Sequence, residues 1–302
     1  MSNINDVIRT MKTGFVGWAY PPPDDVPAEE GADWQIRRSA ELGATCVQVY
    51  GFNTPKSDAG RKATRELAES LGIELEGAAF ALFPPMGETP ESRIPALRAE
   101  LEEAVALGMT VVRAGWGNNS VARSRWAKDG KAQYQHMIDS LKSAAPLAEE
   151  YQLPIAVENH SDFFGWELAN ILRAVDSPWI GAALDTANGF ASIYDPEADN
   201  EALAELAFTT HIKDMRVIDN PLRWAVPHLP VGCHLGEGNV DVVHAIEILA
   251  ERSPKANGLH LIVEAGWEPE GDFPEAVPDP LAYRRSILED GIRWLNDFIA
   301  SR

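Results

Sequence analysis

The chain has 302 residues, of which 26 are Lys or Arg and 46 are Asp or Glu, so its formal net charge is −20. Such a charge repels the phosphates of nucleic acids and anionic lipids, and no apolar stretch reaches the roughly 18–20 residues that cross a bilayer. The first residues also lack the apolar core of a signal peptide, so the sequence predicts a cytoplasmic protein with no nucleic-acid and no membrane partner.

Eight short apolar runs recur along the chain, and each is followed by an amphipathic helical stretch. The predicted strands span residues 13–18, 46–52, 75–83, 110–116, 154–160, 180–186, 208–213 and 259–265. The predicted helices span residues 34–42, 59–71, 93–107, 133–150, 166–175, 197–206, 242–251 and 281–300.

Strands that alternate with helices imply a parallel sheet, and eight such units in about 250 residues plus insertions are typical of a (β/α)8 barrel. A doubly wound open sheet is the alternative, but the first turn reads Gly-Trp-Ala-Tyr-Pro-Pro-Pro instead of the GxGxxG of that class. We therefore predict an α/β protein, a single-domain (β/α)8 TIM barrel over residues 1–302. Inserted loops are expected at about 19–33, 216–240 and 267–280.

The fifth to eighth predicted strands end in ionisable residues: Glu158, Asp185, His211 and Glu264. Because the C-terminal ends of neighbouring barrel strands meet at one rim, these four side chains should converge. Three carboxylates in one small volume cannot all stay ionised without a cation. Three oxygen donors and one imidazole suit Mn²⁺ or Mg²⁺, and Co²⁺ also fits. We therefore predict one divalent metal ion, held by these four residues.

These strand ends resemble those of a known family, the xylose-isomerase-like TIM barrels of the sugar phosphate isomerase/epimerase and endonuclease IV superfamily. The resemblance covers essentially the whole chain. It is strongest in Val-Glu-Asn-His at 157–160, Leu-Asp-Thr-Ala-Asn at 184–188, His-Ile-Lys-Asp at 211–214, Leu-Gly-Glu-Gly-Asn-Val-Asp at 235–241 and Val-Glu at 263–264. In that family the residues that match the four strand-end positions hold one divalent metal.

The resemblance implies a metal-dependent isomerase or epimerase, which removes a proton α to a carbonyl through a metal-stabilised enediolate. In the resembling epimerases two metal-bound glutamates flank the substrate, and here these would be the catalytic residues Glu158 and Glu264. Ketose 3-epimerases usually carry a histidine three residues after the metal-binding aspartate, where this chain has Asn188. The nuclease branch is disfavoured because it needs a basic surface that faces DNA.

Two further residues are candidates for a catalytic role because they lie two positions beyond a predicted ligand, on the same side of the strand. His160 could act as an acid or base or as a donor to the substrate; the alternative is a loop histidine bonded to the backbone. Lys213 could neutralise an oxyanion or a leaving group; the alternative is an ion pair with Asp214 or Glu237. Glu237 itself is expected to brace His211 or a neighbouring strand.

Three tryptophans follow a glycine at a predicted strand end: Trp18, Trp116 and Trp267. They are expected, together with Asn188, to bind the substrate, since indoles can line the CH faces of a sugar; the alternative for each indole is core packing. The acidic stretch after the eighth strand disfavours a phosphorylated substrate. Arg216 and Arg223 leave a carboxylated substrate open, and Trp224 is a candidate lid residue.

The sequence thus favours an isomerase or epimerase that acts on a non-phosphorylated keto-sugar or cyclitol. The alternative is a lyase that uses the same enolate chemistry, either a dehydratase or a C-glycoside deglycosidase-like enzyme that cleaves a 3-keto-glycoside. A barrel that only binds a ligand is a third interpretation. The expected partner is a small sugar or polyol. A homo-oligomer is compatible with the sequence, and the deglycosidase alternative would add a small second subunit.

Overall fold

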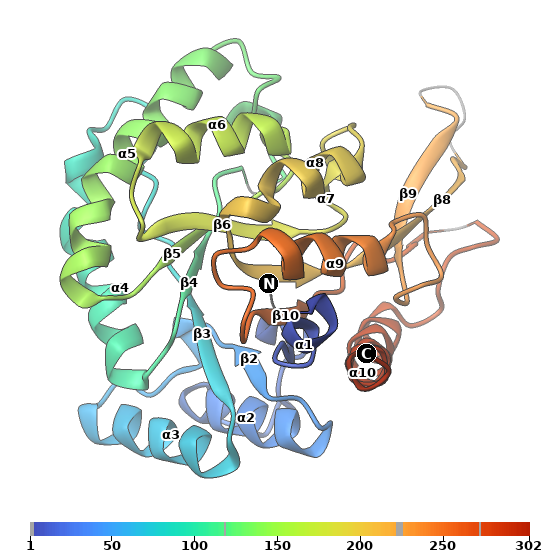
Figure 1. The fold of residues 1–302 in the computed structure, drawn as a ribbon, viewed down its shortest axis with the longest axis horizontal. Coiled ribbons are helices and arrows are strands. Elements are labelled where there is room, and N and C mark those ends of the chain that lie inside the picture. The colour runs from blue at the N-terminus through green and yellow to red at the C-terminus, as the bar shows by residue number, and fades with distance from the viewer. Residues whose placement is uncertain (1–2, 118, 222–225, 272) are drawn as a thin grey trace.

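The fold is taken from a computed structural model that describes residues 3–117, 119–221, 226–271 and 273–302 (Figure 1). Arg223 and Trp224 therefore lie outside the described residues. The bounds of the strands and helices below refer to these ranges.

Eight parallel strands form the core of the molecule, in the hydrogen-bonded order β1-β10-β7-β6-β5-β4-β3-β2. A parallel bridge between Val16 and Gln48 joins the two outermost strands, so the barrel is nearly closed. This confirms the predicted single (β/α)8 barrel. The strands are β1 (Lys12–Phe15), β2 (Cys46–Gln48), β3 (Glu74–Ala78), β4 (Val112–Ala114), β5 (Ile155–Glu158), β6 (Ile180–Asp185), β7 (Ala207–Ile212) and β10 (His260–Val263).

Helices surround the strands on the outside, as the amphipathic stretches predict (Figure 1). The predicted helices correspond to α2 (Gly31–Glu41), α3 (Asp58–Leu71), α4 (Ile94–Leu107), α5 (Gly130–Tyr151), α6 (Gly165–Val175), α8 (Pro196–Leu203), α9 (Val242–Arg252) and α10 (Pro280–Ala300). The short helices α1 (Ile4–Ile8) and α7 (Asn188–Ala191) are not predicted by the sequence pattern.

Local signals set the ends of these helices. Helix α3, for example, begins after Ser57, whose side chain accepts a hydrogen bond from the Gly60 amide, and ends at Gly72, whose φ of 68° favours glycine. Within the described ranges, no helix combines the length and the apolar character that crossing a membrane requires.

The segment after β7, where an inserted loop is expected at about 216–240, contains regular structure. It includes an antiparallel hairpin of β8 (Asp214–Asp219) and β9 (His228–Cys233), which projects from the barrel at the right of Figure 1. The base of the hairpin packs on the segment after β10, because the Gly232 amide donates a hydrogen bond of 2.8 Å to the Trp267 carbonyl. The hairpin therefore lies beside the C-terminal ends of β7 and β10.

Asp214 anchors the loop that follows this hairpin. Its buried carboxylate accepts hydrogen bonds from the backbone amides of Gly236 (3.0 Å), Gly238 (2.9 Å) and Val240 (3.2 Å). Glu237, expected to brace His211 or a neighbouring strand, instead has a side chain that is 68% exposed and lies 3.7 Å from His234. The expectation for Glu237 is wrong, because the backbone of this loop and not its glutamate makes the buried contacts.

Replacing Asp214 with alanine is expected to lower the free energy of unfolding by about 3 kcal/mol or more, since three backbone donors lose their acceptor. Urea unfolding monitored by circular dichroism measures the loss. The matched control is Glu237→Ala in the same loop, for which we expect a change below about 0.5 kcal/mol. Equal losses in both variants would contradict the anchoring role of Asp214.

An ion-pair network around the buried His260 lies near the N-terminal ends of the strands. His260 lies 2.7 Å from Glu76 through Nδ1 and 2.8 Å from Glu74 through Nε2. Two carboxylate acceptors require both ring nitrogens to donate, so the ring is an imidazolium. Burial alone would lower the pKa of His260, but the hydrogen bonds to Glu74 and Glu76 outweigh burial and raise it to about 9.

This raised pKa predicts a pH dependence of stability. Because the folded value exceeds the ordinary 6.5, the contribution of His260 is complete below pH 6.5 and is lost as the pH rises through about 9. We expect the free energy of unfolding to fall by on the order of 3 kcal/mol across this window. NMR titration of His260 should give a midpoint near 9. A midpoint below 6.5 would contradict the paired imidazolium.

Candidate metal centre and active site

The four predicted ligands lie together at the C-terminal rim of the barrel. Glu158 and Asp185 are the last residues of β5 and β6, His211 is in β7, and Glu264 directly follows β10. All four are buried, and one ligand atom from each lies within 4.8 Å of the other three. Two oxygens on opposite sides of an ion with bonds of about 2.1 Å are roughly 4.2 Å apart. The cluster is therefore close to the size that one divalent ion requires.

Two buried oxygens of this cluster, Asp185 Oδ2 and Glu264 Oε2, pair with the Lys213 ammonium, at 2.9 and 2.5 Å. The fit to a metal therefore rests on the donor set. Three carboxylates and one imidazole in one buried cluster are ligands that Mn²⁺ or Mg²⁺ takes in proteins, so the residues present fit a divalent cation.

His211 faces the cluster through one ring nitrogen only. Its Nδ1 lies 3.2 Å from Glu158 Oε1 and 3.5 Å from Glu264 Oε2, whereas its Nε2 lies 3.1 Å from Gln48 Oε1. Gln48 is buried in β2, on the far side of the ring from the carboxylates. Nδ1 is therefore the nitrogen that could ligate an ion.

Lys213 belongs to the same cluster. Its side chain is 4% exposed and pairs with Asp185 and Glu264, not with Asp214 or Glu237. Burial lowers the pKa of Lys213, but the two carboxylates outweigh burial, and the net pKa is raised. Burial likewise raises the pKa of Glu264, but the Lys213 ammonium and His211 hold it well below its usual range. Lys213 is thus a buried ammonium beside two predicted metal ligands.

Arg113, in β4, is a second cation that the sequence analysis missed. It forms an ion pair with Glu158 Oε2, and its side chain is 15% exposed. The sequence does contain a sign of it, because Arg113 is the one charged residue in the otherwise apolar run Val-Val-Arg-Ala at 111–114. Three carboxylates and two cations give these five side chains a formal net charge of −1, which favours the uptake of a cation.

Asn188 connects the members of the cluster. Its backbone amide donates to Asp185 Oδ1 (2.9 Å), its side-chain nitrogen donates to Glu158 Oε1 (3.2 Å), and its side-chain oxygen accepts from Lys213 (3.3 Å). The residue is completely buried. Asn188 therefore orients the ligands, and its role in substrate binding stays a prediction.

His160 lies at the edge of the same site. Its Nδ1 is 3.2 Å from the Ser161 hydroxyl, and its backbone carbonyl accepts a hydrogen bond from Ser192. Burial and the nearby Lys213 and Arg113 lower the pKa of His160 to about 4. The imidazole is therefore neutral at pH 7 and can accept a proton or donate a hydrogen bond.

The three predicted substrate-binding tryptophans occupy different environments. Trp18 is 38% exposed, and its indole nitrogen donates to Glu264 Oε1 at 3.3 Å. Trp267 is 39% exposed, directly after the strand end that carries Glu264. Trp116 is only 1% exposed, because its indole donates to Gln133 and is covered by Arg123. Trp116 is therefore packed in the core, which is the alternative to substrate binding for each of the three indoles.

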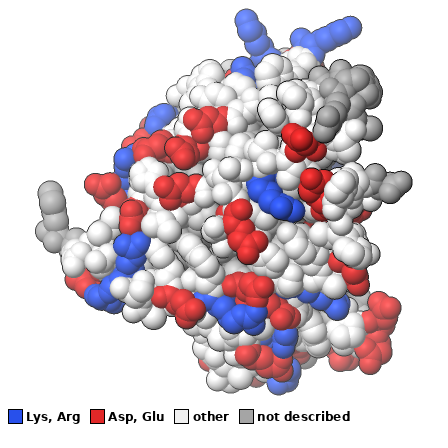
Figure 2. Space-filling model, turned by 90° about the vertical axis from the view of Figure 1, so that its right-hand side faces the viewer, with Lys and Arg blue, Asp and Glu red and all other residues white. Residues whose placement is uncertain are grey.

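The acidic stretch after β10 is partly neutralised. Glu268 is buried and forms two hydrogen bonds of 2.8 Å with Arg284, whose guanidinium lies 5.4 Å from the centre of the Trp18 ring. Figure 2 shows the face that lies at the right of Figure 1. There Asp and Glu side chains are spread over the surface, and Lys and Arg side chains lie among them without forming one basic patch. Negative charge near the rim is therefore smaller than the residue count of this stretch suggests.

The family follows from comparison with known sequences. The sequence profile of the xylose isomerase-like TIM barrel family matches residues 36–298, which is most of the chain. The protein belongs to this family. The family assignment agrees with the barrel and with the position of the buried cluster at its C-terminal rim.

The proteins to which the chain is similar include a decarboxylase and an epimerase. The chain is 26% identical over 218 residues to a 3-oxo-isoapionate decarboxylase from Pectobacterium atrosepticum, covering 72% of each sequence. A xylose isomerase-like barrel from Mycobacterium smegmatis in complex with magnesium superimposes with a TM-score of 0.68, 16% identity and 97% coverage of both chains. A D-psicose 3-epimerase from Clostridium cellulolyticum superimposes with a TM-score of 0.66, 16% identity and coverage of 96% and 99%. The two structures establish similarity of fold.

Proposed function

We propose that the protein is a divalent-metal-dependent lyase that decarboxylates a 3-oxo sugar acid, a polyhydroxylated acid with a ketone β to its carboxylate. The observation that carries the proposal is the buried Lys213 ammonium beside Asp185 and Glu264. The relative from Pectobacterium, a 3-oxo-isoapionate decarboxylase, supports the same reaction class. The lyase thus takes precedence over the isomerase or epimerase that the sequence alone favours.

Two cations, Arg113 and Lys213, are the reason why we favour the lyase over the epimerase. An epimerase of the expected kind needs Glu158 and Glu264 as free bases on opposite faces of the substrate. Here Arg113 pairs with Glu158, while Lys213 and the Trp18 indole contact Glu264. Cations and donors that favour the ionised form weaken a carboxylate as a base. Decarboxylation needs no base to begin.

The candidate site contains the groups that a decarboxylation requires. The bond between the carboxylate carbon and the α carbon breaks, CO₂ leaves, and the electron pair remains on the substrate as an enolate. Glu158, Asp185, His211 and Glu264 would hold a divalent ion, which would supply positive charge to the enolate oxygen. The Lys213 ammonium donates a proton to the α carbon and recovers one from solvent. Arg113 and Lys213 orient the anionic substrate, and the indoles of Trp18 and Trp267 contact its apolar face.

An isomerase or epimerase is the second candidate. It is favoured by the presence of both Glu158 and Glu264 in one cluster, because these are the two carboxylates that proton transfer on opposite faces requires. Neutral His160 would supply an additional base. The same cluster would serve this reaction if the two cations moved away from the glutamates when substrate binds.

One assay separates the two candidates. The purified protein is incubated with Mn²⁺ in D₂O and a panel of 3-oxo sugar acids, keto-sugars, cyclitols and 3-keto-glycosides. We expect CO₂ release from a 3-oxo acid and one deuterium on the carbon that carried the carboxylate. Deuterium exchange α to a ketone without CO₂ would instead indicate isomerisation, and release of water or an aglycone would indicate a dehydratase or a deglycosidase. Chelator-treated protein serves as the control.

A further inference from the structure

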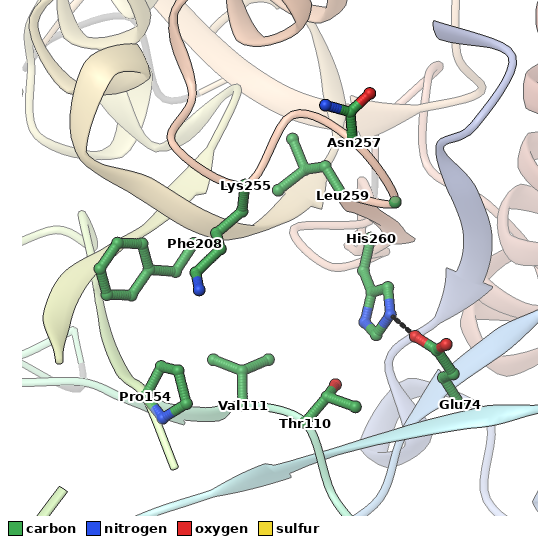
Figure 3. Close-up of a pocket in the computed structure, with 10 residues that line it drawn as sticks. Glu74, Thr110, Val111, Pro154, Phe208, Lys255, Asn257, Leu259 and His260 are labelled. Carbon is green, nitrogen blue, oxygen red and sulfur yellow. Dashed lines mark hydrogen bonds and ion pairs between the residues drawn. The ribbon is translucent and has the colours of Figure 1, made fainter. Parts of the chain in front are cut away.

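A chain of polar side chains, buried except for the partly exposed Glu74, connects the candidate metal centre with the opposite end of the barrel. It runs from Glu74 through His260, Glu76 and Gln48 to His211. These residues come from β3, β10, β2 and β7, so the chain crosses the barrel interior. At the Glu74 end of this chain is a cavity of about 190 Å³. There His260 contacts Glu74, and Lys255 extends between Phe208 and His260 (Figure 3). None of these groups is a ligand of the proposed metal site except His211.

The orientation of Gln48 follows from the hydrogen bonds that Glu76 accepts. The His260 ring and the Thr209 hydroxyl both donate to Glu76 Oε1. The Gln48 amide donates through its NH₂ group to the other oxygen of this carboxylate, Oε2, at 3.1 Å.

The orientation of Gln48 then determines the proton on His211. With its NH₂ group on Glu76, Gln48 presents Oε1 to His211 Nε2, at 3.1 Å, and to the Tyr50 hydroxyl, at 2.8 Å. An amide oxygen accepts, so His211 Nε2 must carry a proton. The lone pair of a neutral ring is then on Nδ1, which faces Glu158 and Glu264.

We propose that Glu76 and Gln48 are positioning residues that keep the proton of His211 on Nε2 and thereby reserve Nδ1 for the metal. The inference rests on the proposed metal site for its consequence, but the position of the proton is a property of the chain itself. Outer partners of a metal-binding histidine typically change metal affinity by about 10–100-fold when they are removed.

The first test uses the unaltered protein with ¹⁵N-labelled histidine. Two-bond ¹H–¹⁵N spectra identify which ring nitrogen of His211 is protonated, in the metal-free protein and after addition of Mg²⁺. We expect a protonated Nε2 in both samples. A deprotonated Nε2 in either sample would overturn the proposal. Failure to bind Mg²⁺ would count against the metal site alone, because the metal-free spectrum still reports on the proton.

The second test is the variant Glu76→Gln, whose amide can donate as well as accept and so allows Gln48 to turn over. We expect about 10–100-fold weaker Mn²⁺ binding in calorimetry, together with loss of the Nε2 proton signal of His211. The matched control Thr209→Val removes one buried hydrogen bond from Glu76 but keeps the charge, and should change the affinity less than about tenfold. Unchanged Mn²⁺ affinity and an unchanged spectrum in Glu76→Gln would refute the proposal.

Discussion

Replacing Lys213 with methionine is expected to reduce decarboxylation by about 10²–10⁴-fold, because the variant loses the proposed proton donor while keeping a side chain of similar length. The expected effect is on kcat more than on Mn²⁺ affinity. Lys213 Nζ lies 2.9 Å from Asp185 and 2.5 Å from Glu264, so its positive charge competes with a cation for the same oxygens. Mn²⁺ should therefore bind to the variant at least as tightly as to the parent. Steady-state kinetics and calorimetry measure the two effects separately.

The matched control for this prediction is Lys255→Met at the opposite end of the barrel, where Lys255 lines the cavity beside Phe208. This variant should keep the activity of the parent. If Lys213→Met kept full turnover, another group would have to supply the proton. If it instead lost Mn²⁺ binding, Lys213 would serve the stability of the metal site and not the reaction.

Replacing Asp185 with asparagine is expected to raise the dissociation constant for Mn²⁺ by more than about 100-fold, which is the upper range for the loss of an outer partner. The amide keeps the oxygen that accepts hydrogen bonds from the backbone amides of Ala187 and Asn188, each at 2.9 Å. The local fold should therefore persist while one charged ligand is lost. Calorimetric titration of the metal-free protein with Mn²⁺ measures the effect, and Glu158→Gln should behave in the same way.

Asp199→Asn is the matched control for the metal ligands. Asp199 is also a buried carboxylate, and burial raises its pKa to about 7, but it serves the backbone amide of Gly165 and lies outside the cluster. Its replacement should leave the Mn²⁺ affinity within about threefold of the parent, as expected for a residue that contacts no ligand. Equal losses of affinity in Asp185→Asn and Asp199→Asn would point to a general loss of structure.

The sequence predicts the barrel well because strand and helix alternate in a pattern that neighbouring residues encode. The convergence of Glu158, Asp185, His211 and Glu264 then follows from topology, since each lies at or just beyond the C-terminal end of a barrel strand. The hairpin of β8 and β9 is less visible. Only Lys213 separates β8 from β7, and Pro230 within β9 is an unfavourable residue for a predicted strand.

Contacts across the barrel could not be predicted in this way. Gln48 meets His211 over a separation of 163 residues, and Arg113 meets Glu158 from the adjacent strand, so both contacts depend on the register of the closed sheet. The burial of Trp116 could not be predicted from the sequence either. It shares the Gly-Trp pattern of Trp18 and Trp267, but its indole N–H donates a hydrogen bond to Gln133 on α5, and the ring lies in the core.

The central claim is that the buried cluster at the C-terminal rim holds one divalent cation. Anomalous scattering from crystals grown with Mn²⁺ tests it most directly, because the signal locates the ion. We expect a single peak bounded by oxygens of Glu158, Asp185 and Glu264 and by Nδ1 of His211, with the Lys213 ammonium displaced from at least one of its two carboxylates. A cluster without a peak at saturating Mn²⁺, with Lys213 still paired to both Asp185 and Glu264, would contradict the claim.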